Sequence, residues 1–131
     1  INTVTNSGTF TNGGNFNAVD VENMETSTFE NTGTLTATTV TNSGTFENLE
    51  TFSAPTVTNS GTFANDGSFT ATEINNTEVF GNTGTLTAST LINSGAFANM
   101  GIFSTTNLNN SETLENMGTL NVTTFINEGN T

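Results

Sequence analysis

Residues 40–56 decide the fold: they read V-T-N-S-G-T-F-E-N-L-E-T-F-S-A-P-T, and the chain then restarts at Val57 with V-T-N-S-G-T-F. The restart defines a period of 17 residues, and nearly the whole sequence can be written as copies of this segment. A repeat this short cannot bury its apolar side chains alone and becomes stable only when it stacks on its neighbours. The sequence therefore predicts a domain made of stacked structural rungs.

Large apolar side chains occupy three columns of the repeat. The first column marks the start of each rung and holds Val4, Val21, Val40, Val57, Ile74, Leu91, Leu108 and Phe125. The second column holds Phe10, Phe29, Phe46, Phe63, Phe80, Phe97 and Leu114, and the third holds Phe16, Leu35, Phe52, Phe69, Leu86, Phe103 and Leu120. A two-residue insertion interrupts the register between Val21 and Phe29, most simply at Ser27 and Thr28. We predict one domain, residues 1–131, of about seven rungs.

Each rung has the pattern of short strands separated by corners. Alternate residues are alike, which is the strand period of two, and the residue types favour strands. Two breaks per rung fall at N-S-G or N-T-G, where Gly or Asn can adopt a positive φ and turn the chain. Glu25, Glu78 and Glu112 replace the first Gly and Glu50 replaces the second, so a positive φ is not obligatory at those corners. A third break, at Pro55, has no fixed Gly.

Three short strands and three corners per rung predict an all-β, three-sided β-solenoid. The period and the residue types are compatible with either hand, so the handedness is left open. Neither end of the pattern shows a capping helix or a polar terminal rung. We therefore expect uncapped ends that expose unpaired backbone groups beside an apolar core.

Asparagine recurs at two corners of every rung, and the first set includes Asn42, Asn59, Asn76 and Asn93. Stacked strands lie about 4.8 Å apart, so identical amide side chains can hydrogen-bond along the stack. We predict structural ladders of these Asn residues, parallel to a stack of the second-column residues Phe46, Phe63, Phe80 and Phe97.

The composition excludes several functions. The 131 residues include no Lys, Arg, His or Cys, and the net charge is −12. Nothing can neutralise phosphates, which argues against nucleic acids and anionic membrane surfaces as partners, and no apolar run could insert into a membrane. The usual catalytic bases and nucleophiles are nearly all missing, so we expect a non-enzymatic protein without a cofactor.

Calcium is the one metal that the sequence suggests. Glu30 and Glu47 occupy one column in successive rungs, and Glu50 lies near a neighbouring corner. Like charges this close repel, and Ca²⁺ with its preference for oxygen ligands would relieve the repulsion. The alternative is that these side chains are simply solvated, and no calcium-loop motif accompanies them.

The third side of the predicted solenoid presents an array of hydroxyl groups. Its outward residues include Thr34, Thr36, Thr38, Thr70, Thr72, Thr85 and Thr87. This array resembles the surfaces of β-solenoid ice-binding proteins, whose threonine grids match the ice lattice. The alternative is that Thr is a favourable exposed strand residue without a charge to repel its neighbours.

The repeats also resemble those of a known class. Residues 42–46 and 59–63 read N-S-G-T-F, and residues 31–35 and 82–86 read N-T-G-T-L. These runs are similar to the β-solenoid repeats of secreted bacterial adhesins and exoproteins, including filamentous haemagglutinin-like proteins and autotransporter passenger regions. The resemblance implies an extracellular rod at the cell surface or in a biofilm matrix, with a glycan or a cell surface as a partner.

We therefore expect a structural protein that is either the rod of such an adhesin or a subunit that stacks end to end on copies of itself. Ice binding is the alternative function.

Overall fold

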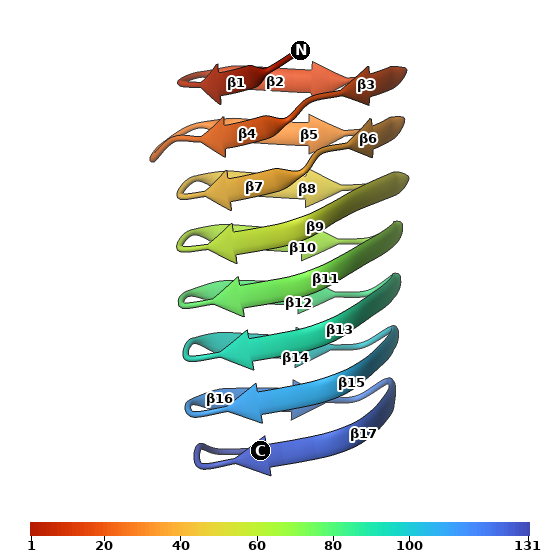
Figure 1. Ribbon diagram of the computed structural model, residues 1–131. Helices are drawn as coiled ribbons and strands as arrows, with labels where there is room; N and C mark the ends of the chain where they lie inside the picture. The colour runs from red at the N-terminus through yellow and green to blue at the C-terminus, as the bar shows by residue number, and fades with distance from the viewer.

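A computed structural model describes all 131 residues as one parallel β-solenoid (Figure 1). Its strands are β1 (Thr3–Asn6), β2 (Thr9–Asn12), β3 (Asn15–Asn17), β4 (Asp20–Asn23), β5 (Thr28–Asn31), β6 (Thr34–Thr36), β7 (Thr39–Asn42), β8 (Thr45–Asn48), β9 (Thr51–Asn59), β10 (Thr62–Asn65), β11 (Ser68–Asn76), β12 (Val79–Asn82), β13 (Thr85–Asn93), β14 (Ala96–Asn99), β15 (Ile102–Asn110), β16 (Thr113–Asn116) and β17 (Thr119–Asn127). There is no helix, and so none with the length and apolarity needed to cross a membrane.

Each strand pairs in parallel with its counterpart in the next rung, as the repeat predicts. Val40 is aligned with Val57, and Phe46 with Phe63, so the sequence columns are also columns in space. The prediction of an all-β solenoid with about seven turns is thereby confirmed. In Figure 1 the chain runs leftward along the front, returns rightward behind and steps down, which makes the coil right-handed. This is the hand that parallel strand connections strongly prefer.

The third corner is a bend rather than a turn. In the first two rungs this corner separates β3 from β4 and β6 from β7. From β9 onward the third side and the following first side form one strand of 9 residues. Pro55 and Thr56 both lie outward between the buried Ala54 and Val57, which bends the strand without ending it. The predicted three sides are consequently gathered into two hydrogen-bonded sheets. This corner lacks the N-x-G sequence that forms the other two turns, so from β9 onward the strand continues through it.

The apolar columns form a continuous core along the axis. The rings of Phe46 and Phe63 stack with centroids 4.7 Å apart, and those of Phe63 and Phe80 with centroids 4.6 Å apart. These separations match the spacing of neighbouring strands, so stacking and strand pairing favour the same rise per rung. Each of these three side chains is completely buried.

The inserted residues lie in the turn between β4 and β5. Thr28 is aligned with Thr45 and is therefore an ordinary strand residue, so the extra length falls within residues 24–27 rather than at Ser27 and Thr28. The buried hydroxyl of Ser27 donates to Oδ1 of Asn23 and closes this longer turn. Sequence could not place the insertion because Ser and Thr are interchangeable at these positions of the repeat.

Corner glycines serve close packing instead of a left-handed backbone. No glycine has a positive φ. Thr26, with φ of 62°, is the only residue that has one. A Cβ atom on Gly84 would lie 2.1 Å from the carbonyl oxygen of Gly67 in the preceding rung. The expected role in positive φ is therefore wrong, and the glycines instead allow successive backbones to approach each other.

Glu50 shows that a side chain can be accommodated at the second corner. At the same corner, Gly67, Gly84, Gly101 and Gly118 each donate the backbone N–H to an Asn carbonyl one rung earlier, at 3.0–3.1 Å. Glu50 makes no equivalent bond to Asn31. Gly33, at the same corner, makes no equivalent bond to Asn12 either, so the absence of this bond does not follow from the presence of a side chain.

Candidate functional sites on the ladders, edges and third side

The asparagine residues at the two corners form continuous buried ladders. Nδ2 of Asn59 donates to Oδ1 of Asn76 at 2.8 Å, to the carbonyl of Gly61 at 3.1 Å and to that of Val79 at 2.8 Å. Asn42, Asn76 and Asn93 make the same three kinds of contact. No buried side-chain nitrogen or oxygen lacks a partner. Each ladder therefore provides hydrogen-bond donors to the carbonyls of the corner backbone and links every rung to the next by a hydrogen bond.

Both ladders have one direction. In every link, Nδ2 belongs to the earlier rung and Oδ1 to the later one, from Asn6→Asn23 through to Asn110→Asn127. At the first rung, Oδ1 of Asn6 accepts only from its own rung, namely from the N–H of Gly8. At the last rung, Nδ2 of Asn127 donates only to its own rung, namely to Gly129. One edge of the solenoid thus presents ladder acceptors, and the other presents ladder donors.

The same two edges carry incompletely covered apolar groups. Val4, Phe10 and Phe16 are half-buried at the first rung, and Leu120 and Val122 are half-buried at the other edge. Phe125, which continues the first apolar column, is 42% exposed. A further rung placed on either edge would bury these side chains and pair the free strand.

The carboxylates suggested as calcium ligands are only partly brought together. Glu30 and Glu47 are direct partners in β5 and β8, and both are half-buried. Glu50, in contrast, follows β8 at the next corner and is exposed. The structure contains no group of three acidic side chains that could hold a metal ion. Two adjacent carboxylates without a third ligand do not make a calcium site of the usual coordination number.

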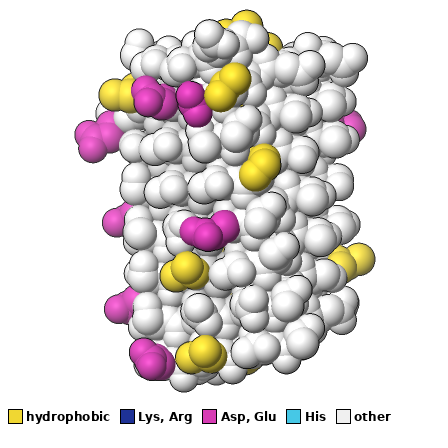
Figure 2. Space-filling view, viewed as in Figure 1, with side chains coloured by type: hydrophobic (Ala, Val, Ile, Leu, Met, Phe, Trp, Pro, Cys, Tyr) yellow, Lys and Arg dark blue, Asp and Glu magenta, His cyan; other side chains and the backbone are white.

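The third side is uncharged. Its outward side chains are those equivalent to Thr51, Ser53 and Pro55 in each rung, and none of them is Asp or Glu although the chain contains 12 carboxylates. Thr34, Thr36, Thr38, Thr70, Thr72, Thr85 and Thr87 are all exposed on it. Carboxylates instead gather elsewhere, notably along the first-corner edge at the left of Figure 2. The rung of β9 presents Ser53 and Pro55 on this side. It lies between the rung of Thr34, Thr36 and Thr38 and the rungs of Thr70, Thr72, Thr85 and Thr87.

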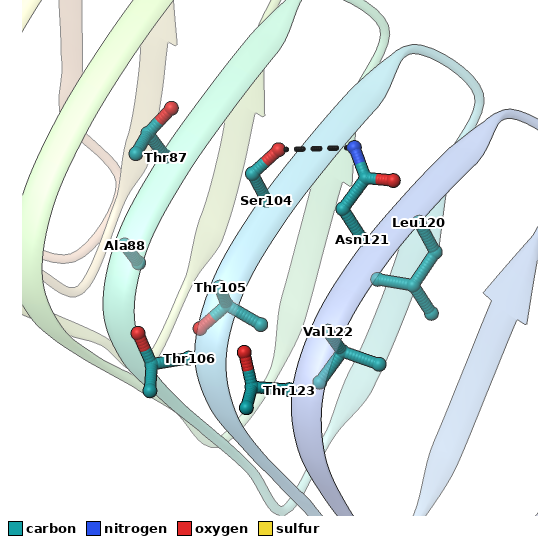
Figure 3. Close-up of a pocket in the computed structure, with 9 residues that line it drawn as sticks. All are labelled: Thr87, Ala88, Ser104, Thr105, Thr106, Leu120, Asn121, Val122 and Thr123. Atoms are coloured by element: carbon teal, nitrogen blue, oxygen red, sulfur yellow. Dashed lines mark hydrogen bonds between the residues drawn. The ribbon is translucent and has the colours of Figure 1, made fainter.

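A hollow of about 560 Å³ lies on the third side, over β13, β15 and β17 (Figure 3). One wall is a row of Thr87, Ser104 and Asn121, which are aligned in register, and the other includes Thr106 and Thr123. Ala88, Thr105, Leu120 and Val122 complete the lining. Ser104 is half-buried between the exposed Thr87 and Asn121, and its shorter side chain deepens the surface there.

Sequence reasoning identified the columns but missed the hollow and the direction of the ladders. The only sequence signal for the hollow is Ser104, and it is not specific because Ser53 stands in the same row outside the hollow. The direction of the ladders has no sequence signal, because an amide can point either way along the stack.

Comparison with known proteins adds no family to this description: no family model, no curated protein and no solved structure matches the chain.

Proposed function

We propose that this protein is a non-enzymatic extracellular structural rod, either a subunit that stacks end to end into a fibre or the stalk of a surface adhesin or biofilm-matrix protein. One observation carries the proposal: the strands, the core columns and both Asn ladders repeat in register from rung to rung. Each rung is therefore a template for another. The resemblance of the N-S-G-T-F repeats to secreted bacterial adhesins supports the extracellular setting.

The partner that best fits each edge is a second copy of the chain, stacked head to tail. A donor edge meets an acceptor edge only in this orientation, whereas like edges would set donors against donors or acceptors against acceptors. The parallel strands have the same requirement, because continuing the ladder needs the same chain direction. Stacking would also bury the half-exposed apolar side chains of both edges, at roughly 25 cal/mol per Å² of apolar surface.

The distribution of charge favours the same orientation. Residues 1–19 contain no carboxylate, whereas Glu112, Glu115 and Glu128 lie near the opposite edge. Two donor edges brought together would set these carboxylates against their own copies, with no cationic side chain to neutralise them. Head-to-tail stacking places them beside an uncharged rung.

Electron microscopy and sedimentation of the purified chain test the proposal. We expect the unmodified chain to form unbranched fibres of constant width. Val4→Asp and Phe125→Asp each place a charge in the first apolar column at one edge, so each variant alone should stay monomeric with an intact far-ultraviolet CD spectrum. Thr70→Asp adds the same charge at an exposed position in the middle of the solenoid, and it should leave fibre formation unchanged.

Mixing the two edge variants tests the orientation. Each retains one open edge of opposite type, so a mixture should give dimers and nothing larger. Dimers of either variant alone would show that like edges pair and would refute head-to-tail stacking. A chain that remains monomeric at every concentration would refute stacking itself.

Ice binding is a second candidate, favoured by the absence of carboxylates from the exposed hydroxyl face. Water at an ice surface offers a regular array of donors and acceptors, which aligned hydroxyl groups can match without the strong hydration of a charged side chain. We expect thermal hysteresis to be measurable and to be lost in Thr70→Asp, while Thr62→Asp on the opposite sheet retains it. Equal hysteresis in the two variants, or none in the unmodified chain, would dispose of this candidate.

A further inference from the structure

We propose that the hollow over β13, β15 and β17 binds a neutral saccharide. The hollow reaches the terminal strand β17, but its two outward rows stay on the surface of the third side when a further rung covers that edge, so this inference does not depend on stacking. Its nine lining residues come from three successive rungs and include no charged side chain (Figure 3).

The lining groups suit a ligand that both donates and accepts hydrogen bonds. The hydroxyls of Thr87, Ser104, Thr106 and Thr123 can each do both, as can the amide of Asn121. Nδ2 of Asn121 donates to Oγ of Ser104 at 3.3 Å, which leaves the Ser104 hydroxyl proton free to donate to a bound molecule. Thr105 differs, because its hydroxyl already donates to the carbonyls of Ser89 and Asn107.

Charge selects against ionic ligands. An anion would find no cationic partner in a chain of net charge −12. A cation would find no carboxylate in the hollow and would be drawn to the other faces of the solenoid. The remaining class is an uncharged molecule rich in hydroxyl groups.

Size and shape narrow this class to sugars. The hollow has a volume of about 560 Å³ and is shallow and open to solvent, so a ligand would lie along the surface with one side exposed. Ala88, Thr105 and Val122 alternate with the outward residues and turn toward the core, so the two polar rows supply the side-chain contacts and can reach the hydroxyls of a pyranose ring. The rows run parallel to the solenoid axis, so a short linear oligosaccharide would lie along them.

Saturation-transfer difference NMR tests the proposal, because it observes the sugar and works whether the protein is monomeric or assembled. The probes are methyl glycosides of neutral hexoses and neutral trisaccharides, with glucuronic acid and glucosamine as charged counterparts. We expect transfer to a neutral saccharide with a Kd of about 1 mM or weaker, and none to the charged sugars.

Ser104→Val partly fills the hollow and removes the Ser104 hydroxyl. It should weaken saccharide binding by about tenfold, the effect of one hydrogen bond. Ser53→Val makes the same change in the same column outside the hollow, so it should bind as the unmodified chain does. Three results would each overturn the proposal: no transfer to any neutral saccharide, equal transfer to glucuronic acid, or equal losses in the two variants.

Discussion

Phe63→Asp is expected to abolish the cooperative unfolding transition of the solenoid. Phe63 is completely buried, and its ring stacks on Phe46 and Phe80 and also contacts Phe52 and Phe69. Removing a buried Phe side chain alone costs about 3–5 kcal/mol, and burying an unpaired carboxylate costs more. Since domains are stable by about 5–15 kcal/mol, this one change removes most or all of the stability.

The effect should spread because a solenoid is stabilised mainly by contacts between neighbouring rungs. A broken rung at the centre leaves two short stacks, neither of which has many interfaces. We expect far-ultraviolet CD to lose most of its strand signal and electron microscopy to show no fibres.

Phe63→Leu is the matched control for size and position. Leu114 already occupies the same column, so a Leu there should cost about 1 kcal/mol and preserve the fold. Thr62→Ser, at the exposed neighbouring position, should have no measurable effect. A folded, fibre-forming Phe63→Asp variant would contradict the assignment of this column to the core.

The repeat pattern was sufficient to predict most of the fold because position in the rung decides burial. A period of 17 residues, interrupted by one two-residue insertion, set the registers, and alternation within the rung separated inward from outward residues, as at Phe52 and Ser53. What it could not supply depends on backbone geometry. Pro55 marks a corner in the sequence, but whether a strand ends or merely bends there depends on pairing with the rungs on both sides.

The same limit applies to the glycines and to the candidate sites. Both a positive φ and a close approach of two backbones favour glycine, so the sequence alone could not distinguish the two reasons at Gly84. The hollow beside Ser104 and the direction of the Asn ladders both depend on side-chain geometry, which a repeat of residue types does not encode.

Asn59→Leu is expected to destabilise the solenoid by about 4 kcal/mol, although the two side chains have similar shapes. The amide of Asn59 donates to Asn76, Gly61 and Val79, and it accepts from Asn42. Leu would leave the carbonyls of Gly61 and Val79 with one partner fewer in the interior. Each buried polar group left unpaired costs about 1–3 kcal/mol, and the sum over the partner groups exceeds the gain of about 1.5–3 kcal/mol from burying a Leu side chain. Thermal or urea unfolding measures the difference.

Asn127→Leu separates the buried ladder contacts from those at the solvent-exposed end of the same column. Asn127 stands in the same column at the exposed edge, where it accepts one ladder bond from Asn110 and donates only to Gly129. Water can replace its bonds, so this variant should unfold within about 1 kcal/mol of the unmodified chain when both are monomeric. In fibres the amide of Asn127 would also donate to the next copy, and the same substitution should then weaken assembly. Equal stability losses at positions 59 and 127 in the monomer would mean that the amides contribute only locally and that the ladder does not hold the rungs together.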